Sequence, residues 1–246
     1  MTRRGLIAGA AGFAGLGVAA TLADRFGLVP TDSGTLYGAG ATLTYAAQRL
    51  LTRGSLAREF PRDQISSRPF ANGQPPKDEP FVRMQSAGFS AWRLAVDGMV
   101  ARPVTLSLAD LRALSRRSQI TSVVCEEGWS YIAEWTGVPL ADVLTAAGVS
   151  PQARYVAYFT HESFWTDSID MTEAMHPQTL ITYGMNGTDL PPGHGGPLRL
   201  RVPRQLGYKS AKYLTRITVT DSVKGIGSKG LGGVAPDAGY SWYAGI

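Results

Sequence analysis

The residue with the clearest potential for chemistry is Cys125, the single cysteine in a chain of 246 residues. It follows the apolar run 120–124 and is itself followed by Glu126 and Glu127. A single cysteine excludes an intramolecular disulfide framework and any zinc or iron–sulfur site that needs several cysteines of this chain. A lone thiolate can still serve as a nucleophile or as one soft ligand to a metal.

The residues around Cys125 leave three interpretations open. In a noncatalytic binding module, a lone cysteine at the end of an apolar strand is a buried small hydrophobe. In a hydrolase or transpeptidase it would be the nucleophile, with His161, His176 or His194 as the base. The two acidic residues that follow argue against the nucleophile, because negative charge raises the pKa of a thiol. The third interpretation is a thiolate ligand to a metal, which needs one cysteine only.

Several separated motifs resemble the sulfite oxidase-like molybdopterin oxidoreductases. Residues 124–130, VCEEGWS, and residues 135–140, WTGVPL, resemble the cofactor loop of that family. Residues 191–203, PPGHGGPLRLRVP, and 207–212, GYKSAK, match it as well. The resemblance covers about residues 93–221 and implies a sulfite oxidase-type fold with a Mo-molybdopterin cofactor.

The resemblance also implies roles for single residues. Cys125 would bind Mo, and coordination would keep its thiol deprotonated and protected from oxidation. The positions implied in contacts to the pterin and its phosphate are Thr160, His194, Arg199, Ser210, Ala211 and Lys212, together with Arg68, Phe70 and Asn72 in the early segment. His194 stands where the family often has Asn, and both side chains form hydrogen bonds. Because a phosphate binds fixed positive charge, we expect Arg199, Lys209 and Lys212 to hold it.

The implied reaction is oxygen-atom transfer with two electrons. An oxidase for the sulfite anion is expected to place arginines beside the metal, whereas Glu126 and Glu127 follow the cysteine here. We therefore expect reduction of sulfoxides, with methionine sulfoxide in proteins as the substrate that the resemblance implies. Sulfite dehydrogenase is the alternative.

The source of electrons must be another protein. The sequence has no Cys-X-X-Cys-His haem attachment site and no ligand set for an iron–sulfur cluster. Residues 225–230 fit a GxGxxG pattern, but the residues after them do not favour the helix that dinucleotide binding requires. The family resemblance implies a membrane haem b protein as the partner.

The first 24 residues resemble a twin-arginine export signal. Arg3 and Arg4 precede an uncharged, weakly apolar run over residues 5–23 that is rich in Gly and Ala. We expect an exported protein, periplasmic or on the outer face of the cytoplasmic membrane. A retained membrane anchor and an accidental pair of arginines are the alternatives.

The composition narrows the class of protein. The formal net charge is +5, but the basic residues are scattered, so a small anionic ligand is a better expectation than nucleic acid. Charged residues make up 17% and hydrophobic residues 44% of the chain, and Gly and Pro are abundant. This balance excludes a coiled coil and a disordered chain.

Strand patterns outnumber helix patterns and alternate with them irregularly, which predicts an α+β fold with a mainly β core and peripheral helices. Asp97-Gly98 predicts a tight hairpin turn, and the alternation over 198–202 predicts a strand with one apolar and one basic face. The predicted division of the chain is a signal or anchor at 1–24, an extended wrapping segment at 25–80, a molybdopterin-binding oxidoreductase domain at 81–222 and a Gly/aromatic tail packed on it at 223–246. A partner-docking role is the alternative for the tail.

Overall fold

The computed structural model describes residues 38–52, 54–161 and 165–246, so the expected export signal lies outside the described residues. The chain divides into two units, residues 1–55 and 56–246. The first unit contains helix α3 (Gly38–Thr52), and the prediction of an extended segment is wrong for this stretch. Ala, Leu, Gln and Arg make up most of α3, and all four are strong helix formers. Within the described residues, no helix is both long and apolar enough to cross a membrane.

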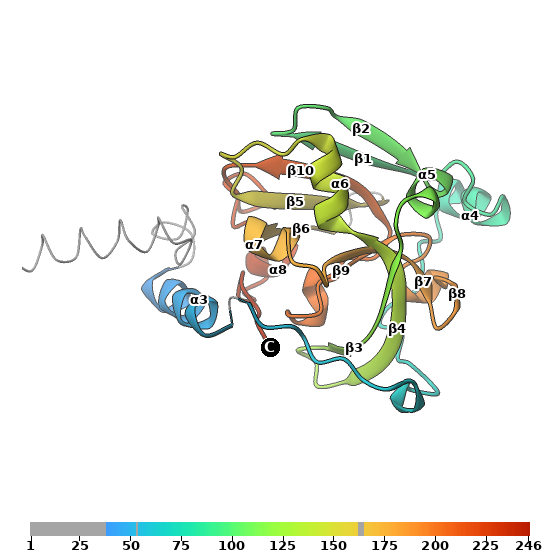
Figure 1. The fold of residues 1–246 in the computed structure, drawn as a ribbon, viewed down its shortest axis with the longest axis horizontal. Helices are drawn as coiled ribbons and strands as arrows, with labels where there is room; N and C mark the ends of the chain where they lie inside the picture. The colour runs from blue at the N-terminus through green and yellow to red at the C-terminus, as the bar shows by residue number, and fades with distance from the viewer. Residues whose placement is uncertain (1–37, 53, 162–164) are drawn as a thin grey trace, which may run out of the picture. The chain divides into compact units, whose positions relative to one another are not determined.

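The second unit is built on two five-stranded sheets (Figure 1). The first sheet has the order β2-β1-β10-β5-β6. Its strands are β1 (Arg93–Gly98), β2 (Val104–Ser107), β5 (Tyr155–Thr160), β6 (Thr166–Asp170) and β10 (Leu214–Thr220). β1 and β10 are parallel, and the other pairs are antiparallel.

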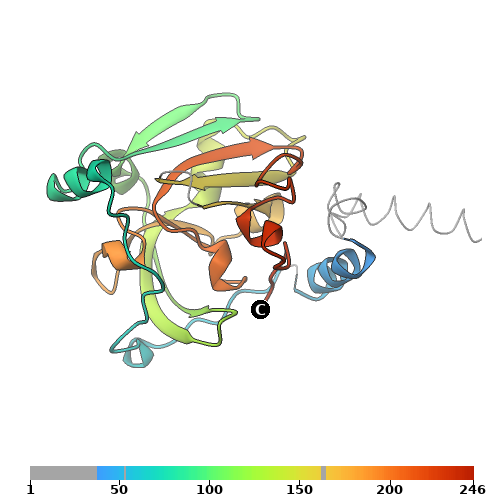
Figure 2. The same cartoon turned by 180° about the vertical axis from the view of Figure 1, so that it is seen from behind.

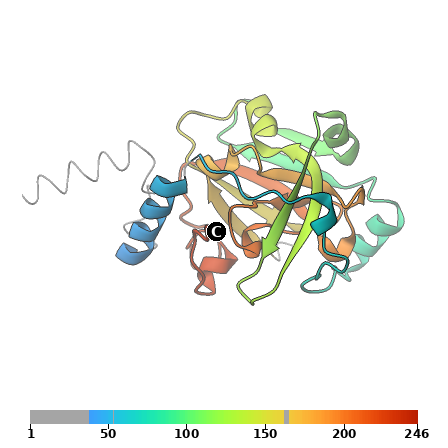
Figure 3. The same cartoon turned by 60° about the horizontal axis from the view of Figure 1, so that its bottom comes forward.

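The second sheet carries the cysteine at the turn of a long hairpin. Its strands are β3 (Arg117–Val124), β4 (Ser130–Pro139), β7 (Leu180–Met185), β8 (Thr188–Asp189) and β9 (Arg199–Arg201). β4 pairs with β3 and β7, and β7 also pairs with β8 and β9. Figure 3 shows β3 and β4 as the long pair of green strands. The predicted α+β class with a β-dominated core is confirmed.

Short helices surround the sheets. They are α4 (Glu79–Ser86), α5 (Leu108–Ala113), α6 (Leu140–Ala147), α7 (Met171–Ala174) and α8 (Val234–Asp237), with 3-10 turns η1 (Arg62–Gln64), η3 (Pro192–His194) and η4 (Gly207–Lys209). Ser107 and Asp110 form the capping box that the sequence predicts for α5. Gly148 ends α6 with φ 72°, a left-handed conformation that glycine adopts without strain.

The predicted tight turn at Asp97-Gly98 is wrong, although the antiparallel pair of strands is present. Gly98 is the last residue of β1 and lies against Val219 of β10. A Cβ at this position would come within 2.1 Å of the Val219 carbonyl oxygen. The glycine therefore permits close packing of two parallel strands, and the chain turns later, before β2.

Two segments of the second unit lie outside the sheets and pack against their strands. Phe60 N–H donates to the Ile120 carbonyl at 2.9 Å, and Ser66 N–H donates to the Ile132 carbonyl at 2.9 Å, so the segment after residue 55 runs along β3 and β4. At the other end of the chain, α8 lies beside β6 (Figure 2). The early segment contributes Phe70 and Asn72 to the cavity described next, and the chain after α8 contributes Tyr240.

Candidate active site

A cavity of about 420 Å³ collects residues that are far apart in the sequence. Of the candidate cofactor residues, those that line it are Phe70, Asn72, Cys125, Thr160, His194, Arg199, Ser210, Ala211 and Lys212. Arg68 is exposed and does not line the cavity. The loose match of the early segment to the family therefore brings Phe70 and Asn72 to the site but not Arg68.

Cys125 is held at the cavity by the turn between β3 and β4. Its N–H donates to the Trp129 carbonyl at 3.0 Å, and its own carbonyl accepts from Gly128 N–H at 3.1 Å. Gly128 has φ 88°, a backbone conformation that is strained for residues with a side chain. The turn leaves Cys125 7% exposed, with its Sγ 3.3 Å from Glu126 Oε2 and 3.9 Å from a carboxylate oxygen of Glu127.

The free thiol is a poor nucleophile in this environment. Burial, with a further contribution from Glu126 and Glu127, raises the pKa of Cys125 to about 11. In the described part of the chain, the side chains that its thiol contacts by hydrogen bonds are these two carboxylates and no histidine. His161 is instead 3.0 Å from Asp78. The arrangement disfavours a cysteine hydrolase, whereas a bound cation would compensate the carboxylates and stabilise the thiolate.

The cavity also contains two cations that are held by carbonyl groups. Arg199 donates from Nε to the Ser210 carbonyl and from Nη1 to the His194 carbonyl, both at 3.0 Å. Lys212 Nζ donates to the Gly193 carbonyl at 2.7 Å and to the Asn72 carbonyl. Among the described residues neither cation has a carboxylate partner, so both retain charge that can bind an anion.

His194 offers a further polar group to a ligand. Its Nδ1 is buried and has no hydrogen-bond partner among the described residues. Burial, followed by the charges of Arg199 and Lys212, lowers the pKa of His194 to about 4. The imidazole is therefore neutral at physiological pH and has an unused buried nitrogen. A buried polar atom of this kind usually has a partner, which fits a cavity made for a polar ligand.

Ser210 is fixed by Arg201 of β9. Arg201 lies with Arg199 on the basic face that the sequence predicts; it is fully buried and donates to Ser210 Oγ at 3.1 Å and to the Ser122 carbonyl. Val202 N–H also donates to Ser210 Oγ at 3.1 Å. All three residues of β9 are buried, and its two arginines lie over the ring of Trp135, with Arg201 at 5.5 Å.

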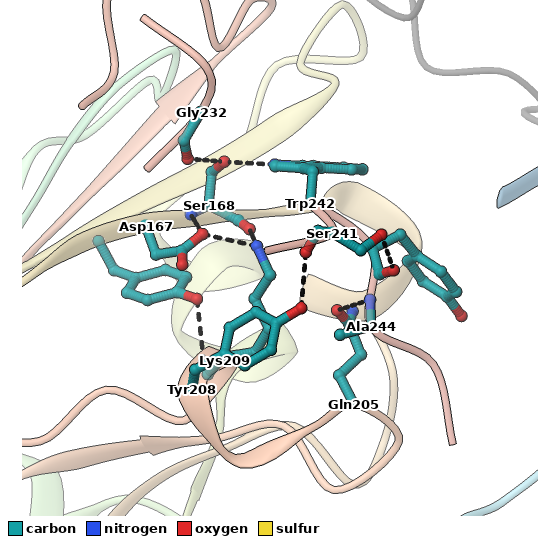
Figure 4. A network of polar contacts seen from close by, with 11 residues as sticks. Asp167, Ser168, Gln205, Tyr208, Lys209, Gly232, Ser241, Trp242 and Ala244 are labelled. Atoms are coloured by element: carbon teal, nitrogen blue, oxygen red, sulfur yellow. Dashed lines mark hydrogen bonds and ion pairs between the residues drawn. The ribbon is translucent and has the colours of Figure 1, made fainter. Parts of the chain in front are cut away.

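The prediction that Lys209 holds the phosphate is wrong. Lys209 does not line the cavity, because its Nζ is buried 2.6 Å from Asp167 Oδ1 and 3.0 Å from the Ser168 carbonyl (Figure 4). Lys212 does line the cavity, as predicted. Sequence spacing alone could not distinguish the two lysines. Lys209 is the last residue of the 3-10 turn η4 and is directed at Asp167, whereas Lys212 lies after the turn and lines the cavity.

The walls include aromatic residues that the sequence prediction did not name. They are Trp129, Tyr131, Trp165, Tyr208, Tyr213 and Tyr240. Phe70 contacts Trp129 with ring centroids 4.9 Å apart, and Asn72 Nδ2 donates to Glu127 Oε2 at 3.3 Å. Thr160 Oγ1 accepts from Trp165 N–H at 2.9 Å. The only signal in the sequence for these walls is that several of the aromatic residues lie within or next to the motifs.

Comparisons with known proteins identify the family. The family model described as oxidoreductase molybdopterin binding domain matches residues 81–225. A relative from Azospira oryzae, named putative protein-methionine-sulfoxide reductase subunit YedZ1, is 37% identical over 80% of this chain and 70% of its own length. The catalytic subunit MsrP of protein-methionine-sulfoxide reductase from Xanthomonas campestris pv. campestris is 34% identical over 60% of this chain. The chain spans about half the length of that MsrP relative.

A solved structure supports the fold. The sulfane dehydrogenase SoxCD from Paracoccus pantotrophus matches with a TM-score of 0.52 and 24% sequence identity. The match covers 54% of this chain and 39% of that chain. The motifs, the fold and the family match agree: this chain belongs to the oxidoreductase molybdopterin binding domain family, as the predicted resemblance to the sulfite oxidase-like enzymes implied, and it is an oxidoreductase with a Mo-molybdopterin cofactor.

Proposed function

We propose that the cavity binds Mo-molybdopterin through Cys125 and that the chain reduces sulfoxides, with methionine sulfoxide in proteins as the substrate. The observation that carries the proposal is that two complementary groups line one cavity. A lone thiol lies beside two carboxylates, and the same cavity is lined by two cations without carboxylate partners among the described residues. The relatives named as parts of protein-methionine-sulfoxide reductase support the choice of substrate.

Each part of the cofactor has residues of suitable chemistry. When bound, it supplies two-electron oxygen-atom transfer. Cys125 would provide a soft thiolate ligand, and Arg199 and Lys212 would hold the phosphate by charge-assisted hydrogen bonds. Neutral His194 would hydrogen-bond the pterin with its unused Nδ1. The backbone at Ser210 and Ala211 would lie beside the phosphate of the cofactor.

The two carboxylates beside the thiol favour a neutral substrate over sulfite. Glu127 is fixed there because it accepts from Trp129 Nε1 at 2.8 Å and from Asn72. Carboxylates held beside the thiol repel an anion and leave a neutral sulfoxide unaffected. The aromatic walls provide apolar contacts for a thioether product.

Two assays on the purified enzyme test the substrate. One follows oxidation of a reduced dye by methionine sulfoxide, free and in a protein, and the other follows reduction of ferricyanide by sulfite. We expect the larger kcat/KM for methionine sulfoxide. A much larger kcat/KM for sulfite would identify a sulfite dehydrogenase and overturn the substrate proposal.

Cys125→Ala tests the assignment of the ligand. It should abolish turnover, because it removes the protein's soft ligand. The thermal unfolding midpoint should stay near that of the wild type, since the side chain is small and lies at a cavity wall. Full turnover of this variant with Mo bound would overturn the assignment.

Electrons should come from a separate protein, because the chain itself has no haem attachment site or iron–sulfur ligand set. The family resemblance implies that this partner is a membrane haem b protein. The relatives named as subunits support a partner protein. Deletion of the partner's gene should stop turnover in the cell and leave the dye-linked activity of the purified enzyme intact. Direct reduction by NADH at a comparable rate would contradict this part of the proposal.

Export by the twin-arginine route agrees with a cofactor that is inserted before the protein leaves the cytoplasm. Changing both Arg3 and Arg4 to Lys keeps the charge and should destroy recognition of the arginine pair. We expect Mo-loaded, active enzyme to accumulate in the cytoplasm. Normal export of this double variant would count against the route without affecting the proposed Mo site.

A further inference from the structure

A buried polar network (Figure 4) includes Tyr208, which also lines the cavity. Lys209 and Asp167 form an ion pair at 2.6 Å in which both side chains are fully buried. The Lys209 carbonyl accepts from the Tyr158 hydroxyl at 2.9 Å. Burial lowers the pKa of Lys209, and the adjacent Asp167 offsets part of this shift. The ion pair thus ties the 3-10 turn η4 to the strand β6.

The end of the chain closes over this network. Trp242 Nε1 donates to Ser168 Oγ at 2.8 Å, and the Lys209 ammonium lies 5.3 Å from the centre of the Trp242 ring. The Tyr208 hydroxyl donates to the Ser241 carbonyl at 2.6 Å. Ser241 and Trp242, which make these contacts, belong to residues 240–246. We name residues 240–246 the C-terminal clamp.

Backbone hydrogen bonds join the C-terminal clamp to the segment before η4. Leu206 N–H donates to the Ala244 carbonyl at 2.8 Å, and Ile246 N–H donates to the Arg204 carbonyl at 3.0 Å. The Gln205 side chain accepts from Ala244 N–H at 3.4 Å. Backbone and side-chain contacts therefore hold residues 204–209 from one side.

The other side of the same short segment forms the cavity wall. Tyr208, Ser210, Ala211 and Lys212 line the cavity, and so does Tyr240 of the C-terminal clamp. The rings of Tyr208 and Tyr240 lie 5.3 Å apart. Because η4 is only three residues long, the clamp contacts at Tyr208 and Lys209 are one to four residues from the candidate phosphate contacts.

We propose that the C-terminal clamp positions residues 207–212 for the cofactor, so that seating of the clamp and binding of Mo-molybdopterin stabilise each other. Trp242 and Lys209 are positioning residues in this arrangement, since they act through the loop and do not line the cavity. The inference rests on the proposed location of the cofactor in the cavity. Coupling between two binding events is reciprocal, so the cofactor must stabilise the clamp by the same factor as the clamp stabilises the cofactor.

Trp242→Phe is the primary test because it keeps an aromatic ring and removes one indole hydrogen bond. Trp92→Phe is the matched control. Trp92 is 2% exposed against 4% for Trp242, and its Nε1 donates to the Leu214 carbonyl at 2.9 Å, outside the cavity lining. Both full-length proteins are produced in a host that makes the cofactor, and molybdenum per chain is measured by mass spectrometry during dialysis.

We expect both variants to lower the thermal unfolding midpoint by similar amounts. Trp242→Phe should also lose molybdenum roughly five- to tenfold faster than the wild type and change the Mo(V) paramagnetic resonance spectrum, whereas Trp92→Phe should do neither. Equal molybdenum loss in both variants would assign Trp242 to stability alone and overturn the inference. Wild-type protein without molybdenum would instead overturn the proposed cofactor site, which distinguishes the two failures.

Hydrogen exchange on the wild type tests the reciprocal effect. The amides of Leu206, Ala244 and Ile246 should exchange more slowly in cofactor-loaded protein than in cofactor-free protein, by a factor comparable to the change in molybdenum loss. Amides of α6, which is remote from the cavity lining, serve as the internal reference. Identical protection of the three clamp amides in both forms would contradict coupling.

Discussion

Lys209 and Lys212 are three residues apart and have opposite environments. Lys209 is paired with a carboxylate and fully buried, and Figure 4 shows its side chain directed at Asp167. In the part of the chain that the structure describes, Lys212 has only carbonyl partners, at Gly193 and Asn72, and it lines the cavity. One cation is neutralised inside the protein, and the other keeps its charge for a ligand.

The difference shows how to separate structural from functional charge in one loop. A buried cation whose partner is a carboxylate adds no net charge to its surroundings. A cation held by neutral carbonyls stays positive, and Arg199 beside Lys212 is held in the same way. The pairing partner, and not burial alone, therefore decides which residue can bind an anionic phosphate.

The largest expected effect is the loss of stability in Lys209→Met. Removing the cation leaves Asp167 charged, buried and unpaired, which costs about 3–5 kcal/mol in the free energy of unfolding. Denaturant unfolding of the cofactor-free protein measures this. A stability within about 1 kcal/mol of the wild type would contradict the assignment of Lys209 as a structural cation.

Lys212→Met should have the opposite pattern. The stability of the cofactor-free protein should remain close to that of the wild type, because the ammonium has no buried charged partner among the described residues. Retention of Mo-molybdopterin should fall by about 10- to 100-fold, which corresponds to the loss of one charge-assisted hydrogen bond to a phosphate. Lys212→Arg should restore much of the retention, and unchanged retention in the Met variant would place the phosphate elsewhere.

The sequence predicts which residues meet at one cavity better than it predicts the environment of each lysine. Motif spacing brings Cys125, His194, Arg199 and Lys212 to one cavity, because each motif lies at the end of an element that the fold places there. It fails at Lys209, because a 3-10 turn and a carboxylate 42 residues away in the sequence determine the direction of that side chain. Long-range pairing of this kind leaves no local pattern.

The same reasoning explains the errors in the fold. A glycine after Asp predicted a turn at Gly98, but the residue that requires the missing Cβ is Val219 on a distant strand. Alternation predicted a basic face on β9 but gave no sign that its arginines are buried against Trp135. Local patterns predicted the class of fold and the capping of α5, whereas contacts between distant strands decided these exceptions.

For Lys212, the stability of the cofactor-free protein and the retention of the cofactor should depend on pH with opposite signs. Burial and the neighbouring Arg199 lower the pKa of Lys212 from 10.5 to about 8. Between pH 8 and 10.5 the unfolded chain binds more protons at this residue, so Lys212 makes the cofactor-free protein more stable as the pH rises. Cofactor retention should change the other way, weakening above about pH 8 as the ammonium is lost.

The check for this prediction is the difference between the wild type and Lys212→Arg, since the guanidinium stays charged throughout the range. Subtracting the two profiles removes the contributions of other titrating groups. Retention in the wild type should fall by at most tenfold per pH unit above pH 8 relative to the variant. Parallel profiles would show that the charge of Lys212 does not contribute to binding.

The smallest expected effect is the double change Lys209→Met and Asp167→Asn. Replacing both members of a buried ion pair by neutral groups of similar shape is often close to neutral, because the desolvation cost of both charges disappears with their attraction. The introduced amide carries no charge that needs a partner, and its oxygen can still accept the Ser168 N–H that Asp167 Oδ1 accepts at 2.7 Å. We expect the double variant to unfold within about 1 kcal/mol of the wild type, recovering most of the loss in Lys209→Met. A double variant as unstable as the single one would mean that the ammonium stabilises the fold chiefly through the Ser168 carbonyl and the Trp242 ring.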